Sequence, residues 1–508
     1  MCDDICMEQV PEGGTQIMVN EDCVRDGGEC RRGDRRREQL EILGNDFGFL
    51  GTLSVVYGIC ATFCLYRNPL GITVPLFVAV TYGVMFFIFR RMKMAVKRGS
   101  VCLAAVSFMI GLSTCFTANY VVGYHMNRLA LVLLFCIFVL HQSHQDDRWN
   151  IGKYVVSIMV YLAQAVGMIS YPFSHLVKFI ASIKSRRCKN VLWLIVGICA
   201  AVPAMIILSL LLASADMVFQ NMMDVIIKEF LNPVTIFLVT VQTAAWTLIL
   251  YCLVCSTYAG EISDGTADRR VCSPVAAISF MSMIGLVYLV FSIIQVVYLF
   301  MGKGSLPWGM TYSEYARQGF FQLLFVAILN LVMVLACLKY CKKHVLLNAV
   351  LFIISLCTYV MIASAIYRMV LYVQQYHLTF LRVLVLWFLA MLVVLMAGVV
   401  ILIFNNAFPL FRFCLVTVAV FYLGFAWMKP DYIIAKYNVE HGALADIYNL
   451  DYYRSLSADA APAVMAMENT AARDLLLKQY AESYDDVDGG SMGIRTVNVS
   501  ALKARSLR

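Results

Sequence analysis

Long uninterrupted runs of apolar residues, separated by short polar or charged segments, fill the chain from about residue 48 to about residue 428. A helical run of about 18 or more such residues is long enough to cross a hydrocarbon core about 30 Å thick. The runs do not alternate between apolar and polar positions with a period of two, which favours helices over a transmembrane β-barrel. The pattern therefore predicts an all-α fold, a polytopic bundle of membrane helices.

Eleven of these runs are predicted to span the membrane. They are residues 48–66, 70–90, 101–119, 128–143, 191–216, 233–256, 274–300, 315–338, 345–371, 378–404 and 409–428. A further apolar segment, residues 154–181, is interrupted by Pro172 and carries His175 and Lys178. Charged groups and proline are unfavourable in the centre of a bilayer, so we expect this segment to be re-entrant or interfacial. If it crosses fully, the bundle has twelve spans.

Composition agrees with a membrane protein, since 61% of the 508 residues are hydrophobic, 14% are charged and the mean hydropathy is +0.76. The net charge of +8 comes from basic clusters that flank apolar runs, without the interleaved aromatic residues of a nucleic-acid-binding surface. We therefore expect the lipid bilayer as the partner and no nucleic acid. The basic loops are expected to contact anionic lipid headgroups.

The basic clusters also predict the orientation, because cytoplasmic loops are enriched in lysine and arginine. If the N-terminus is cytoplasmic, the inner side collects the basic residues of segments 31–37, 90–98, 184–189, 269–270 and 339–343. The C-terminal tail then lies outside the cytoplasm, and the protein crosses the membrane several times. If the segment 154–181 spans the bilayer, every later loop changes side.

Four parts follow along the chain. Residues 1–47 form a polar, basic arm that we expect to be disordered. Residues 48–181 hold four spans and the re-entrant or interfacial segment 154–181. Residues 182–428 hold seven spans, and residues 429–508 form a polar tail with short helices. No internal repeat is evident, which argues against the transporter folds that are built on inverted repeats.

Several charged residues stand at span ends that this topology places on the outer side. Arg368 and Arg382 flank the turn YVQQYHLT, and Asp216 ends another span. We predict a polar cluster of Asp216, Glu314, Arg317, Arg368 and Arg382, rimmed by Tyr312, Tyr315, Tyr372 and Tyr376. Arginine presents a planar fork of donors suited to carboxylate and phosphate, so this cluster could bind an anionic headgroup or solute.

Structural interpretations of the same residues stay open. The cluster could be an internal ion-pair network that fixes the order of the helices, and arginines near helix ends often reach the interface along their apolar stems. Thr311 and Glu314 also fit a capping box, in which Glu314 would serve to start a helix and would bind no ligand.

Other motifs do not predict catalysis or metal binding. His141, His144, Asp146 and Asp147, in HQSHQDD, have a spacing compatible with metal ligands, but we expect a solvated loop at a span end. The sequence has no phosphate-binding glycine loop, no Gly-x-Ser-x-Gly elbow and no zinc-protease signature. We therefore assign no catalytic residue, no metal site and no cofactor.

Four segments in the second half of the chain carry a resemblance to a known family. They read GICAAVPAMIILSLLLASADMVF, TYSEYARQGFFQLLFVAILNL, YRMVLYVQQYHLTFLR and YNVEHGALADIYNLDYYRSLSADAAPAV, and they cover roughly residues 190–465. In this order they resemble a bacterial family of polytopic membrane proteins, the domain-of-unknown-function family four-one-seven-three, with its sibling four-one-five-three. The resemblance implies a multi-pass protein of a bacterial inner membrane, but it implies no activity, because the family has none assigned.

The family pattern adds a C-terminal motif to the charged residues named above. Carried onto this sequence, it implies Asn438, Asp459 and Pro462. The pattern usually has glycine in the turn where this chain has His377, so a role that requires a positive φ is not expected at that position.

Three functions fit these observations. The first is a sensor or assembly protein of the envelope, with a membrane or envelope protein as a possible partner. Its outer cluster would accept the C-terminal segment around SLSADAAPAV or an external ligand, and its basic inner loops would contact anionic lipid or a cytoplasmic partner. The second is a transporter or lipid-handling protein that uses the cluster as a site for an anionic substrate. The third is an intramembrane enzyme for a lipid-linked substrate, with Glu314 or Asp216 as general base. We favour the first, because a general base must stand apart from counter-ions and these carboxylates have arginines within reach.

Overall fold

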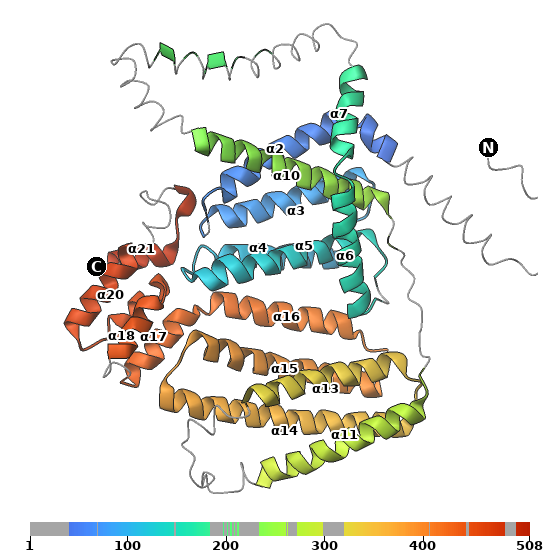
Figure 1. The fold of residues 1–508 in the computed structure, drawn as a ribbon, viewed down its shortest axis with the longest axis vertical. Helices are drawn as coiled ribbons and strands as arrows, with labels where there is room; N and C mark the ends of the chain where they lie inside the picture. The colour runs from blue at the N-terminus through green and yellow to red at the C-terminus, as the bar shows by residue number, and fades with distance from the viewer. Residues whose placement is uncertain are drawn as a thin grey trace, which may run out of the picture. The chain divides into compact units, whose positions relative to one another are not determined.

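Long helices make up most of the described chain in a computed structural model of the protein (Figure 1). The structure describes residues 40–68, 70–146, 149–182, 233–260, 272–297, 320–405, 407–442, 447–482 and 494–508, together with Ile262 and scattered positions between 197 and 212. Two compact units are distinguished, and each is described by itself. The smaller comprises Met1–Ser54, Tyr161–Ile226 and Leu248–Ser263, and the larger comprises Val55–Val160, Ile227–Thr247 and Asp264–Arg508.

Within the described residues, nine helices are long and apolar enough to cross a membrane. They are α2 (Phe47–Leu65), α3 (Thr73–Arg91), η1 with α5 (Val121–Met126 and Asn127–Ser143), α10 (Pro233–Ala259), α11 (Pro274–Gln295), α13 (Phe320–Tyr340), α14 (Val345–Tyr376), α15 (Phe380–Phe404) and α16 (Leu410–Trp427). Each overlaps a predicted run, so the all-α membrane bundle is confirmed. The count of eleven or twelve spans is not confirmed, and the predicted run 191–216 lies almost wholly outside the described residues.

The apolar segment 154–181, which we expected to be re-entrant or interfacial, lies in two helices. They are α6 (Ile151–Gly167) and α7 (Tyr171–Ser182), and they are bent by 42° relative to each other. Pro172 stands at the second position of α7, where a proline is tolerated because the first turn of a helix has no intrahelical acceptor for its N–H groups. Counted together as one broken span, the pair would raise the number of candidate spans from nine to ten in the described part of the chain. A re-entrant loop fits the same geometry.

The helix α4 (Arg98–Ser113) is shorter than the predicted run 101–119. Its last residues turn their hydroxyl groups back onto the helix, since Ser113 Oγ donates to the carbonyl of Ile110 at 2.7 Å and Thr114 Oγ1 donates to that of Gly111 at 2.6 Å. Hydroxyl side chains that bond nearby backbone groups compete with helical hydrogen bonds and favour helix ends. The predicted span included the run STCFTAN, but after Ser113 this run forms a turn.

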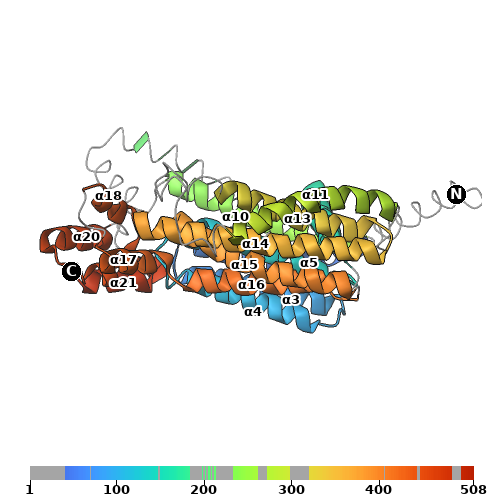
Figure 2. The ribbon, with the colours of Figure 1, turned by 90° about the horizontal axis from the view of Figure 1, so that it is seen from below.

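The described residues between 430 and 508, which we call the C-terminal domain, form a small helical domain of the larger unit. It contains α17 (Pro430–Glu440), α18 (Ile447–Ser455), η3 (Ala458–Ala460), α19 (Ala461–Val464), α20 (Thr470–Glu482), η4 (Ile494–Thr496) and α21 (Val499–Ser506). Its core includes Ile434, Tyr453 and Leu476, and is continuous with Val373 of α14 and Phe425 of α16. Figure 2 shows α17, α18, α20 and α21 gathered beyond one end of α14, α15 and α16.

Candidate functional site

The C-terminal domain contacts three turns that join membrane helices of the larger unit. These turns are residues 66–72 between α2 and α3, residues 114–119 between α4 and η1, and residues 377–379 between α14 and α15. Backbone groups at the ends of helices lack helical partners and must be satisfied in another way. At these three turns, side chains of the C-terminal domain supply several of the missing partners, and we call this contact region the junction.

Arg382, in the first turn of α15, closes the end of α14. Its Nη1 donates hydrogen bonds to the carbonyl oxygens of Tyr376 and His377. Its guanidinium carbon lies 4.3 Å from the centroid of the Tyr372 ring. A cation at this place satisfies carbonyl groups that have no helical partner and offsets the negative end of the helix dipole. These contacts give Arg382 a structural role in the α14–α15 turn.

Asn438 and Tyr452 hold the same turn from the C-terminal domain. The side-chain amide of Asn438 accepts from Leu378 N at 2.8 Å and donates to Leu378 O at 2.9 Å. The Tyr452 hydroxyl accepts from Phe380 N, the first residue of α15, at 2.9 Å. Asn438 is only 3% exposed, so water does not compete for its two hydrogen bonds.

His377 begins this turn with φ 62° and ψ 177°. This region of backbone conformation is nearly restricted to glycine. The expectation that a positive φ is not required at this position is therefore wrong. The chain must reverse directly after the last turn of α14, and the bond from Arg382 to His377 O and those of Asn438 to Leu378 hold the backbone there.

Two carboxylates of the C-terminal domain bind the turn between α4 and η1. Oδ2 of Asp459 accepts from Thr117 Oγ1 at 2.6 Å and from Ala118 N at 3.1 Å. Oδ2 of Asp431 accepts from Asn119 Nδ2 at 2.9 Å, and it also accepts from Ser457 N at 3.0 Å. Both carboxylates therefore accept donors from the membrane helices, and Asp431 also fixes the segment that carries Asp459.

The two carboxyl groups are buried close enough to affect each other. Asp431 is 3% exposed and Asp459 is 2% exposed. Burial raises the pKa of Asp431, and the negative charge of Asp459 raises it further, although the hydrogen bonds from Ser457 and Asn119 oppose this change. Oδ1 of Asp459 is buried and has no hydrogen-bond partner among the described residues.

The start of α21 also binds the turn between α4 and η1. Asn498 Nδ2 donates to the carbonyl oxygens of Thr114 and Thr117 at 3.0 and 2.8 Å. The hydroxyl of Ser500 donates to Phe116 O at 2.6 Å, and the ammonium of Lys429 donates to the Ser500 hydroxyl at 2.9 Å. The amide carbonyl of Asn498 also accepts from Ser500 N, so one side chain caps α21 and binds the turn.

The turn between α2 and α3 is bound by η4. Asn68 Nδ2 donates to Arg495 O at 3.1 Å, and Arg495 Nη1 donates to the carbonyl of Phe63 at 3.1 Å. Asn68 is 1% exposed. The junction therefore joins the C-terminal domain to helices from both the beginning and the end of the membrane bundle.

Only some of the predicted site residues lie at the junction. Tyr372, Tyr376, Arg382, Asn438 and Asp459 all lie at the junction. Arg368 lies within α14 and is 9% exposed, and Pro462 occupies the first turn of α19. Asp216, Tyr312, Glu314, Tyr315 and Arg317 lie outside the described residues, so the complete cluster stays a prediction.

Sequence reasoning missed Asp431, Asn119 and Asn498. Asp431 follows Lys429 and Pro430 directly after a span, and that position reads as a solvated helix start. Nothing in the local sequence indicates that this carboxyl group is buried, because its burial depends on Ser457 and Asn119, far away in the chain. The polar run STCFTAN was the available signal, since four polar side chains inside an apparent span require partners.

The expectation of a solvated loop at HQSHQDD is also wrong for the residues that the structure describes. The Asp146 side chain is 6% exposed, and its Oδ2 lies 2.6 Å from His141 Nδ1. Tyr154 donates its hydroxyl to the same oxygen. The acidic side chain therefore turns inward to partners on α5 and α6. Asp147 lies outside the described residues.

Comparisons with known proteins give one family. A family model described as Domain of unknown function (DUF4153) matches residues 99–467, which is more than half of the chain. The match begins about ninety residues before the segments that carried the resemblance, so it includes nearly all of α4, the whole of α5 and the turn 114–119 of the junction. No curated protein and no solved structure matches. The chain is an integral membrane protein with many apolar helices, and it belongs to the family described as Domain of unknown function (DUF4153).

Proposed function

We propose that this protein is a sensor of the bacterial envelope, in which a proton on Asp431 controls how firmly the C-terminal domain holds the membrane helices. One observation carries the proposal. Two buried carboxyl groups lie within electrostatic reach of each other at the junction, and Oδ1 of Asp459 has no hydrogen-bond partner among the described residues. Two buried carboxylates that interact in this way are unfavourable when both are ionised.

The groups around Asp431 favour its carboxyl group as the one that titrates. Burial raises the pKa of both Tyr452 and Tyr480, and the charge of Asp431 adds to each effect. Both tyrosines therefore stay neutral in the physiological range. The direct partners of Asp431, Asn119 and Ser457, do not ionise.

The sign of the pH dependence follows from proton linkage. The pKa of Asp431 is raised in the docked protein, so the docked state binds a proton more tightly than the undocked state. Docking is therefore firmest at a pH below the ordinary carboxyl pKa of 3.8, and it weakens as the pH rises through the raised value. In the proposed orientation the C-terminal domain lies outside the cytoplasm, so the relevant pH is that of the envelope.

The proposal assigns the junction to conformational control and needs no catalytic step. A loosened C-terminal domain would uncover the polar turns 114–119 and 377–379 for an envelope protein partner. The basic residues at the opposite ends of the helices, such as Arg90 and Arg91, would hold the inner side against anionic lipid.

Hydrogen exchange of the purified protein in lipid nanodiscs tests this proposal. Between about pH 4 and about pH 9, we expect the protection factors of amides in residues 114–119 and 431–464 to fall as the pH rises. The protection factor is corrected for the intrinsic exchange rate at each pH. Asp431→Asn should remove most of this dependence, because the amide keeps an acceptor oxygen for Asn119 and Ser457 but does not ionise.

Asp451→Asn is the matched control. The Asp451 side chain is 73% exposed and lies outside the junction, so its replacement should leave the pH dependence unchanged. Constant protection of wild type over the whole pH range would exclude the proposal. Equal pH dependence in wild type and Asp431→Asn would assign the effect to another group and exclude it as well.

A further inference from the structure

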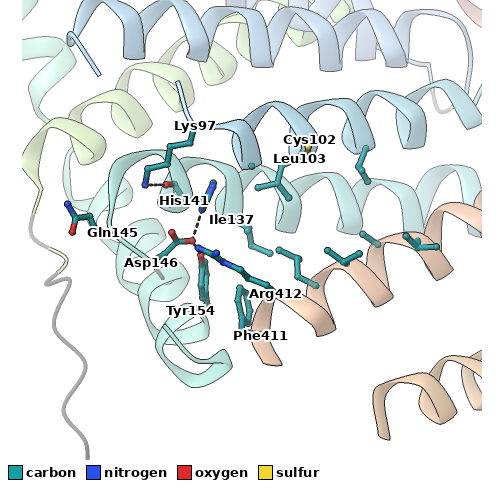
Figure 3. Close-up of a pocket in the computed structure, with 16 residues that line it drawn as sticks. Lys97, Cys102, Leu103, Ile137, His141, Gln145, Asp146, Tyr154, Phe411 and Arg412 are labelled. Atoms are coloured by element: carbon teal, nitrogen blue, oxygen red, sulfur yellow. Dashed lines mark hydrogen bonds and ion pairs between the residues drawn. The ribbon is translucent and has the colours of Figure 1, made fainter. Parts of the chain in front are cut away.

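A partly open cavity of about 850 Å³ lies between α4, α5, the start of α6 and α16 in the larger unit (Figure 3). This volume is within the range of roughly 300–1,000 Å³ that small-molecule sites occupy. Its lining changes from charged and polar side chains, such as Lys97, Asp146 and Arg412, to aliphatic ones, such as Val416 and Val420. The charged residues Lys97 and Arg412 lie at the first residues of α4 and α16, which are the ends of these helices opposite to the junction.

One end of the cavity is polar and structurally fixed. The ammonium of Lys97 donates to the carbonyl oxygens of His141 and His144. The ring of His141 is held by Asp146 on one side, and on the other side Gly99 approaches so closely that a Cβ there would collide with His141 Nε2. Figure 3 shows Arg412 reaching toward Asp146 in the same group. These contacts hold the polar groups in place without any ligand, which lowers the entropic cost of binding.

The charges at this end leave a net positive balance. Burial alone would raise the pKa of Asp146, but the hydrogen bonds from His141 and Tyr154 outweigh this effect and hold the pKa below its ordinary value. The ionised Asp146 therefore offsets one of the two cations, Lys97 and Arg412, and one positive charge remains among these three described residues. The ammonium of Lys97 has three N–H donors and uses two for carbonyl groups, so the third can reach an anion.

The other end of the cavity is apolar and lies along a membrane helix. Leu415, Val416 and Val420 follow Arg412 on α16, and Val420 lies eight positions after Arg412, about 12 Å along the helix axis. Val416 is 62% exposed and Val420 is 61% exposed. Exposed valines on a membrane-spanning helix face lipid, so the open side of the cavity is continuous with the bilayer.

We propose that this cavity binds one anionic glycerophospholipid, with the phosphate between Lys97 and Arg412 and an acyl chain along Leu415, Val416 and Val420. A net positive charge at the depth of the headgroups matches an anionic lipid and gives no preference for a zwitterionic one. The apolar wall explains why a lipid fits better than a soluble anion, which would leave that wall in contact with water. The site is separate from the junction and does not depend on the sensor proposed above.

Photo-crosslinking tests the lipid site directly. The full chain is placed in phosphatidylcholine nanodiscs that contain a trace of phosphatidylglycerol with a photoreactive group in its acyl chain. After irradiation, we expect modified peptides from α4, α5 and α16, and an excess of unlabelled phosphatidylglycerol should abolish the modification. The same probe with a phosphatidylcholine headgroup should modify these peptides several-fold less.

Two pairs of variants test whether crosslinking depends on residues that line the cavity. Val416→Trp fills the apolar end and should strongly reduce crosslinking, whereas Val418→Trp, at an exposed valine of the same helix that does not line the cavity, should not. Arg412→Gln should reduce crosslinking about fivefold, which corresponds to about 1 kcal/mol for one basic residue at an anionic surface. Arg98→Gln, an exposed arginine beside the cavity, is its control.

Three results would overturn the proposal. They are equal crosslinking by the two headgroups, equal crosslinking in Val416→Trp and Val418→Trp, and loss of crosslinking when inorganic phosphate is added. The third result would assign the polar end to free phosphate. Variants are compared only if their thermal unfolding temperatures match that of wild type. If Val416→Trp unfolds early, Val416→Phe replaces it with the matching Val418→Phe.

Discussion

Asn438 holds the turn between α14 and α15 with a single side chain. Its amide pairs with both the N–H and the C=O of Leu378, so its loss leaves two buried backbone groups without these partners. We expect Asn438→Ala to lower the free energy of unfolding by about 2–3 kcal/mol. Thermal unfolding in one detergent measures the change. Lys436→Ala on the same helix is the control, since the Lys436 side chain is 56% exposed and its loss should have almost no effect.

Equal unfolding temperatures for the Asn438 and Lys436 variants would contradict this prediction.

The residues of the junction also show what the sequence could predict at this scale. The family resemblance implied Asn438 and Asp459 as site residues, and Arg382 was predicted as one from its charge beside an apolar run. Asp431 was missed, because the energy of a buried carboxyl group depends on partners such as Asn119 that no local pattern connects to it.

At the scale of elements, the α14–α15 turn shows how a strained residue is maintained. His377 adopts a positive φ, which costs a residue with a side chain about 1–3 kcal/mol relative to glycine. Its Nδ1 is buried without a hydrogen-bond partner among the described residues, so removal of the ring loses no bond from that atom. We expect His377→Gly to raise the thermal unfolding temperature and His377→Val to lower it. A lower temperature for His377→Gly would show that packing of the ring outweighs the strain.

Helix positions were predictable from the sequence, but several helix ends were not. Apolar length set the positions of α2, α3 and α15 to within a few residues, since each must match the thickness of the bilayer. The 32 residues of α14 extend about 48 Å, well beyond a hydrocarbon core of about 30 Å. Its last turns are stabilised by Arg382 and by the C-terminal domain. Contacts of this kind come from distant parts of the chain and leave no periodic pattern in the sequence.

At the scale of the whole larger unit, the junction fixes which turns share a side of the membrane. The C-terminal domain binds the turn 114–119, and α5 then leads from η1 to the loop of Gln145 at the opposite end. We expect a membrane-impermeant maleimide to label Lys478→Cys in intact cells and Gln145→Cys only after permeabilisation. The exposed Cys102 and Cys272 are replaced by serine in both variants. The reverse pattern would invert the proposed orientation, and equal labelling would show that α5 does not cross the membrane.

The contacts of the junction connect residues that are very far apart in the chain. The hydrogen bond from Thr117 to Asp459 joins positions 342 residues apart, and that from Asn68 to Arg495 joins positions 427 residues apart. Such non-local contacts form late, because the intervening chain must be made and ordered first. During biosynthesis, α2 to α5 therefore enter the bilayer long before the C-terminal domain is translated. Until then, the polar turns at the ends of these helices lack their hydrogen-bond partners. At this stage a chaperone or protease can distinguish an unfinished protein from a complete one.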